Sequence, residues 1–152
     1  MGQSTDGQIC FGIKFDEGFE FPWKDDLEDF WLEKVLGFQR SFQLFDNDGE
    51  YIDGIKPPQS VIDKYLQEKS DFEESHPQCP FELVNYCSWE CPEYILAIKR
   101  TCKSANRGYP DQFDPSTLTV TKEEIESLID FCHKHEIICE SEPAWYLSSY
   151  WG

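Results

Sequence analysis

Hydrophobic and polar positions alternate along residues 7–15, where isoleucine and phenylalanine recur at every second position. A period of two is typical of a strand that buries one face. Residues 81–87 (FELVNYC) and 94–100 (YILAIKR) are rich in strand-forming side chains and flank the turn SWECPE. These three segments predict the core strands of a sheet.

Three other segments follow the helical period of 3.6 residues. The first, residues 25–37, carries several acids in its first turn and is ended by Gly37. The second begins after Pro57-Pro58, ends before Pro77, and is expected to turn these residues to one face: Val61, Ile62, Tyr65 and Leu66. The third begins at a capping box of Thr121 and Glu124. Its predicted inward residues are Ile125, Leu128, Ile129 and Cys132.

Strands and helices mix without a regular βαβ alternation, which favours an α+β fold with a mostly antiparallel sheet and about three helices. The tetrad DNDG between residues 45 and 50 predicts a hairpin turn. At 152 residues, the chain is expected to form a single domain, residues 1–152. It contains no run of about 18 apolar residues and no secretory signal, so we expect an intracellular protein without a membrane span.

The net charge changes this picture most. Thirty acidic residues stand against thirteen basic ones, giving −17 at pH 7. Residues 1–75 carry −11 of that charge and residues 76–152 carry −6. Such a field repels nucleic acid and anionic membrane. The expected partner is therefore a basic protein surface, although acidity that serves solubility alone is the alternative.

The sequence carries no signature of catalysis. It has no nucleophile elbow, no HExxH motif and no phosphate-binding glycine loop, so we expect neither an enzyme nor a cofactor. Two groups contain zinc-ligand types: Cys87 with Cys91, and Cys132, His133 and His135 with Cys139. Their spacings match no known zinc finger. Buried thiols are the favoured interpretation, and the sequence leaves zinc binding open.

Four bases within nine residues oppose the overall charge: Lys99, Arg100, Lys103 and Arg107. Such a group can grip a phosphate-bearing ligand, for example a signalling nucleotide. The alternative is that these bases form ion pairs with neighbouring acids.

Acids also stand in rows. On the predicted first helix, Asp26, Asp29 and Glu33 lie on one stripe, although like charges so placed destabilise a helix. Neighbouring aromatic residues are expected to anchor this segment to the core, which leaves the acids already arranged for a partner. The predicted partner-binding residues are Glu17, Glu20, Asp25, Asp26, Asp29 and Glu33, with a second patch of Asp46, Asp48, Glu50 and Asp53. A solvated outer face is the alternative.

The chain resembles a group of small acidic proteins of tailed bacteriophages and prophages. The similarity covers the start MGQSTDGQICFGI, the central segments FELVNYCS, YILAIKR and ANRGYP, and the end WYLSSYWG. That resemblance implies expression in the cytoplasm of an infected bacterium and brings no catalytic residues with it.

Together these features predict a non-enzymatic phage protein that mimics nucleic acid. Its target would be a host DNA-handling or defence enzyme: a restriction enzyme, a CRISPR complex, a topoisomerase or a nuclease. Two alternatives are a module that sequesters a small anion at the four bases and a structural or assembly protein of the phage particle.

Overall fold

The computed structural model describes residues 5–16, 18–19, 35–39, 51, 54–75, 79–88 and 90–151. Contacts divide the chain into two compact units. Unit 1 comprises Met1–Pro22 and Cys79–Gly152, and unit 2 comprises Trp23–Gln78. Unit 2 is thus an insertion within the sequence of unit 1. Whether both fold together as one domain stays a prediction.

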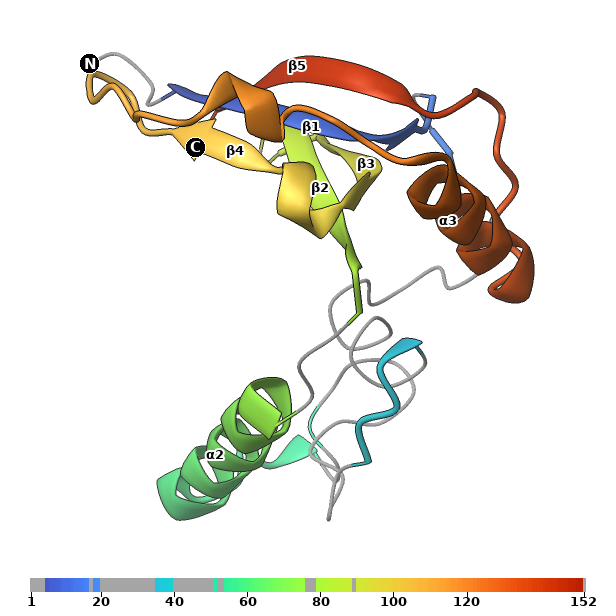
Figure 1. Ribbon diagram of the computed structural model, residues 1–152. Coiled ribbons are helices and arrows are strands. Elements are labelled where there is room, and N and C mark those ends of the chain that lie inside the picture. The colour runs from blue at the N-terminus through green and yellow to red at the C-terminus, as the bar shows by residue number, and fades with distance from the viewer. Residues whose placement is uncertain are drawn as a thin grey trace. The chain divides into compact units, whose positions relative to one another are not determined.

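Unit 1 is built on a sheet of five strands: β1 (Thr5–Lys14), β2 (Phe81–Ser88), β3 (Pro92–Ile98), β4 (Lys103–Ala105) and β5 (Ala144–Trp151). The strand order is β3-β2-β5-β1-β4, with an additional β1–β3 pairing. Every pairing is antiparallel except the short one between β2 and β5. The predicted α+β class with a mostly antiparallel sheet is confirmed (Figure 1).

The strand pairings close a ring. β1 pairs with β5, β5 with β2, β2 with β3, and β3 again with β1. One core cluster lies on the side that this ring encloses: Cys10, Val84, Ile95 and Ala97, with Tyr86, Cys102 and Tyr146 packed against it. The cluster draws on four strands, so its burial ties segments far apart in the sequence.

A buried threonine links β1 to the bend between β3 and β4. Near its C-terminal end β1 pairs with β3, and along Gly7–Ile9 it pairs with β4. Between them lies the 3-10 turn η3 (Lys99–Thr101). The Thr101 hydroxyl accepts from the Phe11 backbone N–H at 2.9 Å and donates to the Ile98 carbonyl at 2.6 Å. A side chain thus replaces the ladder hydrogen bond that the bend interrupts.

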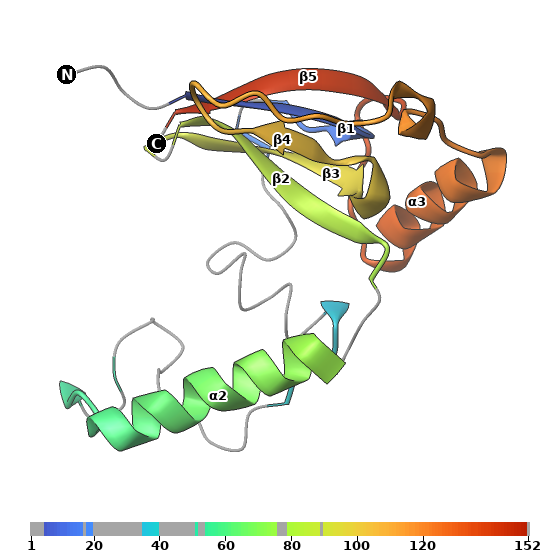
Figure 2. The ribbon, with the colours of Figure 1, turned by 60° about the vertical axis from the view of Figure 1, so that its left-hand side comes forward.

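Helix α3 (Lys122–Lys134) begins at the predicted capping box: Thr121 Oγ1 accepts from the Glu124 backbone N–H, and the Glu124 side chain accepts from that of Thr121. Leu128 and Cys132 are buried on its inner face. The ring of Phe131 lies 4.9 Å from that of Phe81 on β2. Figure 2 shows α3 beside the end of the sheet.

In unit 2, helix α2 (Gln59–Ser75) packs through Tyr65 against Phe38, both of which are buried. Val61 and Phe72 extend the same contact face. The prediction that Leu66 shares this face is wrong, because its side chain is 53% exposed. Val61, Tyr65 and Phe72 define a stripe, and Leu66 is turned about 100° from Tyr65 around the helix.

Other expectations need correction. The described residues contain two α-helices rather than three, since the segment predicted as the first helix lies outside them as far as residue 34. Most of the predicted DNDG hairpin lies outside them too. The strand expected over residues 94–100 ends at Ile98, where η3 begins. No helix in the described ranges is both long and apolar enough to cross a membrane.

Replacing Gly12 by alanine should destabilise unit 1. A Cβ there would collide with the Leu96 carbonyl oxygen and lie 2.7 Å from the Ala97 Cα, both backbone atoms of β3. We expect a loss of about 3 kcal/mol in the free energy of unfolding, measured with denaturant. Gly7→Ala is the matched control, since no atom lies within 4 Å of its Cβ. Equal stability of the two variants would contradict the close β1–β3 packing.

Replacing Thr101 by valine should leave the buried Phe11 N–H without its acceptor. We expect a loss of about 2 kcal/mol in the free energy of unfolding. Thr101→Ser keeps the hydroxyl and should retain protection of the Phe11 amide from hydrogen exchange. A valine variant whose Phe11 amide exchanges as slowly as in the parent would argue against this role.

Candidate functional site

The ten acids predicted to bind a partner all lie outside the described residues. Glu17 and Glu20 belong to unit 1, and the other eight belong to unit 2: Asp25, Asp26, Asp29, Glu33, Asp46, Asp48, Glu50 and Asp53. Their role therefore stays a prediction.

Among the four predicted bases, Arg100 has a structural partner. Its guanidinium donates to both carboxylate oxygens of Glu124, at 2.5 and 2.7 Å, and to the Thr119 carbonyl oxygen at 2.8 Å. The Arg100 hydrogen bonds, followed by the Thr121 backbone N–H, lower the pKa of Glu124 to about 2. This fork-shaped pair links η3 to the first turn of α3, as expected of a base that pairs with a neighbouring acid.

The remaining bases have different neighbours. Lys103 Nζ donates to the Arg100 carbonyl oxygen at 3.3 Å, and Lys103 lines a groove on the outer face of the sheet. The backbone N–H of Arg107 donates to Asp6 Oδ1 at 3.1 Å. The Arg100 guanidinium is thus occupied by Glu124, and Lys103 binds the Arg100 backbone. Anion binding by the four bases stays a hypothesis.

The cysteine and histidine groups are spread over different surroundings. Cys87 and Cys91 are exposed, whereas Cys132 is buried on the inner face of α3. Burial and its contact with Cys139 raise the pKa of the Cys132 thiol. The ring of His135 lies 4.5 Å from that of Phe131. Within the described ranges, no three His, Cys, Asp or Glu side chains are placed to hold one metal ion.

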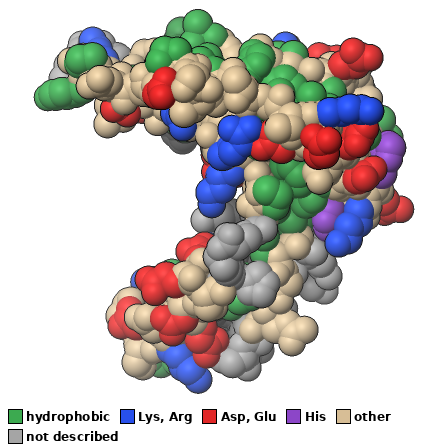
Figure 3. All heavy atoms as spheres, in the orientation of Figure 1, with side chains coloured by type: hydrophobic (Ala, Val, Ile, Leu, Met, Phe, Trp, Pro, Cys, Tyr) green, Lys and Arg blue, Asp and Glu red, His purple; other side chains and the backbone are tan. Residues whose placement is uncertain are grey.

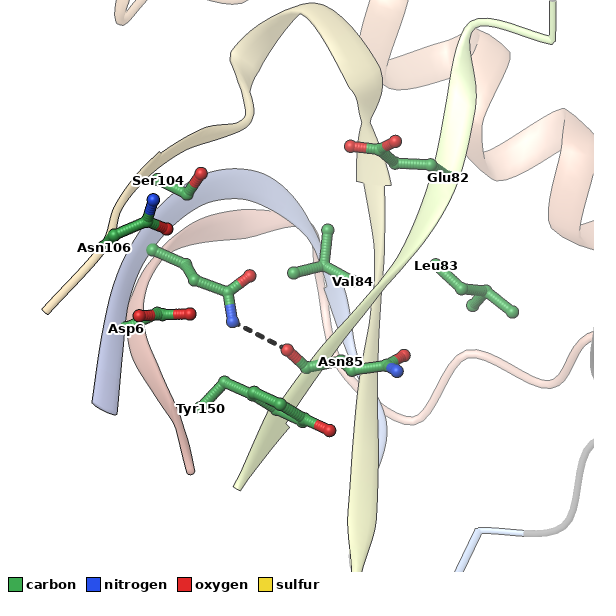
Figure 4. A pocket seen from close by; sticks show the side chains of 9 residues that line it. Asp6, Glu82, Leu83, Val84, Asn85, Ser104, Asn106 and Tyr150 are labelled. Carbon is green, nitrogen blue, oxygen red and sulfur yellow. Dashed lines mark hydrogen bonds between the residues drawn. The ribbon is translucent and has the colours of Figure 1, made fainter. Parts of the chain in front are cut away.

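A hollow of about 490 Å³ opens on the enclosed side of the ring, and we call it the polar pocket. Its lining, drawn in Figure 4, consists of Asp6, Gln8, Glu82, Leu83, Val84, Asn85, Ser104, Asn106 and Tyr150. All belong to unit 1. The lining includes two carboxylates but no lysine, arginine or histidine.

Strand alternation explains which side chains reach the polar pocket. Asp6, Gln8 and Cys10 occupy every second position of β1, so they share one face. Gln8 pairs with Ser104 of β4, and Asp6 pairs with Tyr150 of β5. On this face of β1, Cys10 belongs to the apolar core cluster. Gln8 and Asp6, which precede it on the same face, are polar and form part of the pocket wall.

Hydrogen bonds fix part of this wall. Gln8 Nε2 donates to the Asn85 carbonyl oxygen at 2.8 Å, which spans from β1 to β2 (Figure 4). The Arg107 backbone N–H holds Asp6 Oδ1. Ser148 lies opposite Gln8 in the β1–β5 register. Its buried Oγ has no hydrogen-bond partner in the described part of the chain.

Below the lining lies a pair of thiols. Val84 belongs both to the pocket lining and to the core cluster that contains Cys10, against which Cys102 packs. The Cys10 thiol, burial and Glu82 all raise the pKa of Cys102. The Cys102 thiol is therefore held protonated beneath the pocket, and Glu82 links it to the wall, whereas the contact with Cys102 lowers the pKa of the Cys10 thiol.

A second hollow of about 490 Å³ lies on the opposite face of β1, and we call it the apolar groove. Its apolar lining includes Ile9, Ala105, Phe113 and Leu147. The Leu147 side chain is 84% exposed. Trp145 on the same face of β5 is also exposed, and its ring makes an edge contact with Phe11 at 5.4 Å.

The polar pocket is not predicted by any pattern in the sequence. Its two carboxylates, Asp6 and Glu82, lie 76 positions apart in the sequence. One signal was present: the alternating pattern of the first strand, extended toward its N-terminus, turns from Cys10 to polar Gln8 and Asp6. An inward polar position in a core strand marks either an unpaired group or a site.

Comparison of the chain with protein-family models, curated proteins and solved structures found no match in any of the three. A function for the protein therefore has to be inferred from its own residues and their arrangement.

Removing the carboxylate of Glu124 should change how stability depends on pH. The pKa of Glu124 in the fold is about 2, below the ordinary 4.5. The charged carboxylate therefore stabilises the fold fully at pH values above 4.5. That contribution is lost as the pH falls from about 5 to about 2. We expect Glu124→Gln to lower the melting temperature at pH 7, with a difference from the parent that shrinks toward pH 2.

Glu126→Gln is the control, because the ion pair that Glu126 makes within the described residues is an exposed one, with Lys122 at 3.4 Å. A Glu124→Gln difference that stays constant from pH 7 to pH 2 would show that the carboxylate is not the stabilising group.

Proposed function

We propose that the protein is a non-enzymatic inhibitor that binds the basic, nucleic-acid-binding surface of a host protein. The observation that carries this proposal is the uncompensated negative charge. Unit 2 holds fourteen acidic and six basic residues, a net charge of −8 over 56 positions. Such a surface attracts a basic groove that ordinarily receives phosphates.

The described acids of unit 2 support this proposal. Asp71, Glu73 and Glu74 lie near the C-terminal end of α2, whose last turn contains no base. The helix dipole makes that end negative, so Glu73 and Glu74 in the last turn destabilise the helix, whereas Asp71 accepts a hydrogen bond from Gln67 Nε2 at 2.7 Å. None of these three forms an ion pair with a described residue. Figure 3 shows acidic side chains gathered over α2. Acids kept at a position where they destabilise the helix are more simply explained by a role in binding than by solubility.

The exposed apolar side chains of unit 1 favour a protein as the partner. Trp145, Leu147 and Trp151 alternate along the outer face of β5, and Phe113 is exposed beside them at the apolar groove. A gathering of exposed aromatic and aliphatic side chains is typical of protein–protein interaction sites. Such an inhibitor would bind its partner through two surfaces, the acidic surface of unit 2 and the exposed apolar side chains of unit 1.

The bacterial context is part of the proposal. From the expected resemblance of the chain's start, centre and end to small acidic phage proteins, we infer expression during infection, in the host cytoplasm. The targets that fit are enzymes with basic grooves: restriction enzymes, CRISPR complexes, topoisomerases and nucleases.

Reversing the predicted acid row should abolish capture of such a partner. We expect the immobilised protein to retain nucleic-acid-binding proteins from bacterial lysate at low salt. It should release them at high salt, because the screening length falls from about 30 Å at 0.01 M to about 10 Å at 0.1 M. The triple variant Asp26→Lys, Asp29→Lys, Glu33→Lys should retain them at least about tenfold less well. Quantitative mass spectrometry of the retained proteins measures both effects.

The matched control reverses three exposed acids on α3 of unit 1: Glu123, Glu126 and Asp130. It changes the net charge equally and should keep most of the retention. The proposal fails if no nucleic-acid-binding protein is retained at low salt, or if both triple variants lose retention equally.

A further inference from the structure

The polar pocket is lined in a way that selects a positively charged organic group. Its wall combines the carboxylates of Asp6 and Glu82 with the polar side chains of Gln8, Ser104 and Asn106, and with the ring of Tyr150. We propose that this pocket binds a guanidinium group, carried by an arginine side chain of the partner protein. The identification of the partner as a basic protein rests on the function proposed above.

Charge and placement exclude the other simple ligands. An anion would meet two carboxylates and, in the described lining, no base. A metal ion requires several ligand atoms about one point. No group of three or more His, Cys, Asp or Glu side chains in the described ranges offers that. Asp6 and Glu82 instead approach the pocket from opposite sides (Figure 4). Carboxylates so placed suit a cation with donors on more than one edge.

The uncharged lining favours guanidinium over ammonium. Because Gln8 Nε2 donates to the Asn85 carbonyl oxygen, the atom that Gln8 offers a ligand is its acceptor oxygen. Ser104 and Asn106 add further acceptors along β4 and just after it. A guanidinium carries five N–H donors in a planar fork, whereas an ammonium carries three on one point charge. Several acceptors around a hollow therefore match the planar group.

Tyr150 extends the match. An aromatic ring in the wall gives the flat face of a guanidinium a surface on which to stack. The carboxylates of Asp6 and Glu82 are half-buried, and a cation that pairs with them offsets the cost of burying their charge.

The volume indicates that the cation arrives as part of a larger molecule. About 490 Å³ is within the range of sites that hold drug-sized ligands, and it exceeds what a guanidinium alone would fill. The aliphatic stem of an arginine side chain would lie along Val84, the apolar member of the lining that joins the core cluster.

The test uses the full chain and a blocked pentapeptide with arginine between glycines, titrated by calorimetry and by NMR of the protein's side-chain amides. We expect saturable binding that shifts the Gln8 amide signals. The lysine peptide should bind at least about tenfold more weakly. Agmatine, a free guanidinium compound, is the second probe. Agmatine that binds more tightly than the peptide would overturn the assignment to a protein partner.

Two variants locate the site, Asp6→Asn and Glu82→Gln. Each should lower the affinity for the arginine peptide at least about tenfold. Glu123→Gln on α3 removes a comparable charge away from the pocket and should bind as the parent does. Absence of saturable peptide binding overturns the proposal, and so does equal binding by all variants. Should a pocket variant fail to fold, Tyr150→Leu and the shift of the Gln8 amide in the parent protein give the same decision.

The outcome is separable from that of the lysate experiment. If the pocket variants lose the peptide while partner capture from lysate still depends on the acid row, both proposals stand. Peptide binding at the pocket without any captured nucleic-acid-binding protein would overturn the proposed function and leave a guanidinium site. Partner capture without peptide binding would overturn the pocket assignment alone.

Discussion

The fold of unit 1 depends on how β1 satisfies its backbone hydrogen bonds on both edges. One edge pairs with β5 from Thr5 to Gly12, and the other edge is divided between β3 and β4. Where it is divided, the Thr101 hydroxyl accepts from the Phe11 N–H in place of a strand. A buried amide left unpaired would cost about 1–3 kcal/mol. The bend that Thr101 permits also places Ser104 and Asn106 at the polar pocket.

The two faces of β1 consequently serve different environments. Cys10 lies in the core of the ring while Asp6 and Gln8 line the polar pocket, and Ile9 and Phe11 on the other face meet the apolar groove and Trp145. Because side chains alternate, a slip of one residue would exchange the two sets. Gly12 fixes the register further, since its missing side chain leaves space for the β3 backbone. The register that places Cys10 in the core therefore also places Asp6 and Gln8 at the pocket.

Local patterns were enough to predict much of this fold. Alternation identified β1, the turn signal identified the β2–β3 pair, and the capping box identified the start of α3. β5 was not assigned, because Trp145 and Leu147 on its exposed face hide the alternation with inward Tyr146. Three-residue β4 is too short to show a period. The polar pocket could not be predicted, since only long-range pairing brings its walls together. Asp26, Asp29 and Glu33 lie outside the described residues, so their predicted role rests on the sequence alone.

The insertion of unit 2 within unit 1 sets an order for assembly during synthesis. Thr5 of β1 pairs with Trp151 of β5, so the first strand waits for residue 151 to leave the ribosome before its pairing with β5 can form. Residues 23–78 emerge long before that. The inserted unit can therefore collapse while Phe11 and Ile13 are still uncovered, and the interval exposes an unpaired apolar strand to aggregation. Strong negative charge along the nascent chain keeps such copies apart until the last strand arrives.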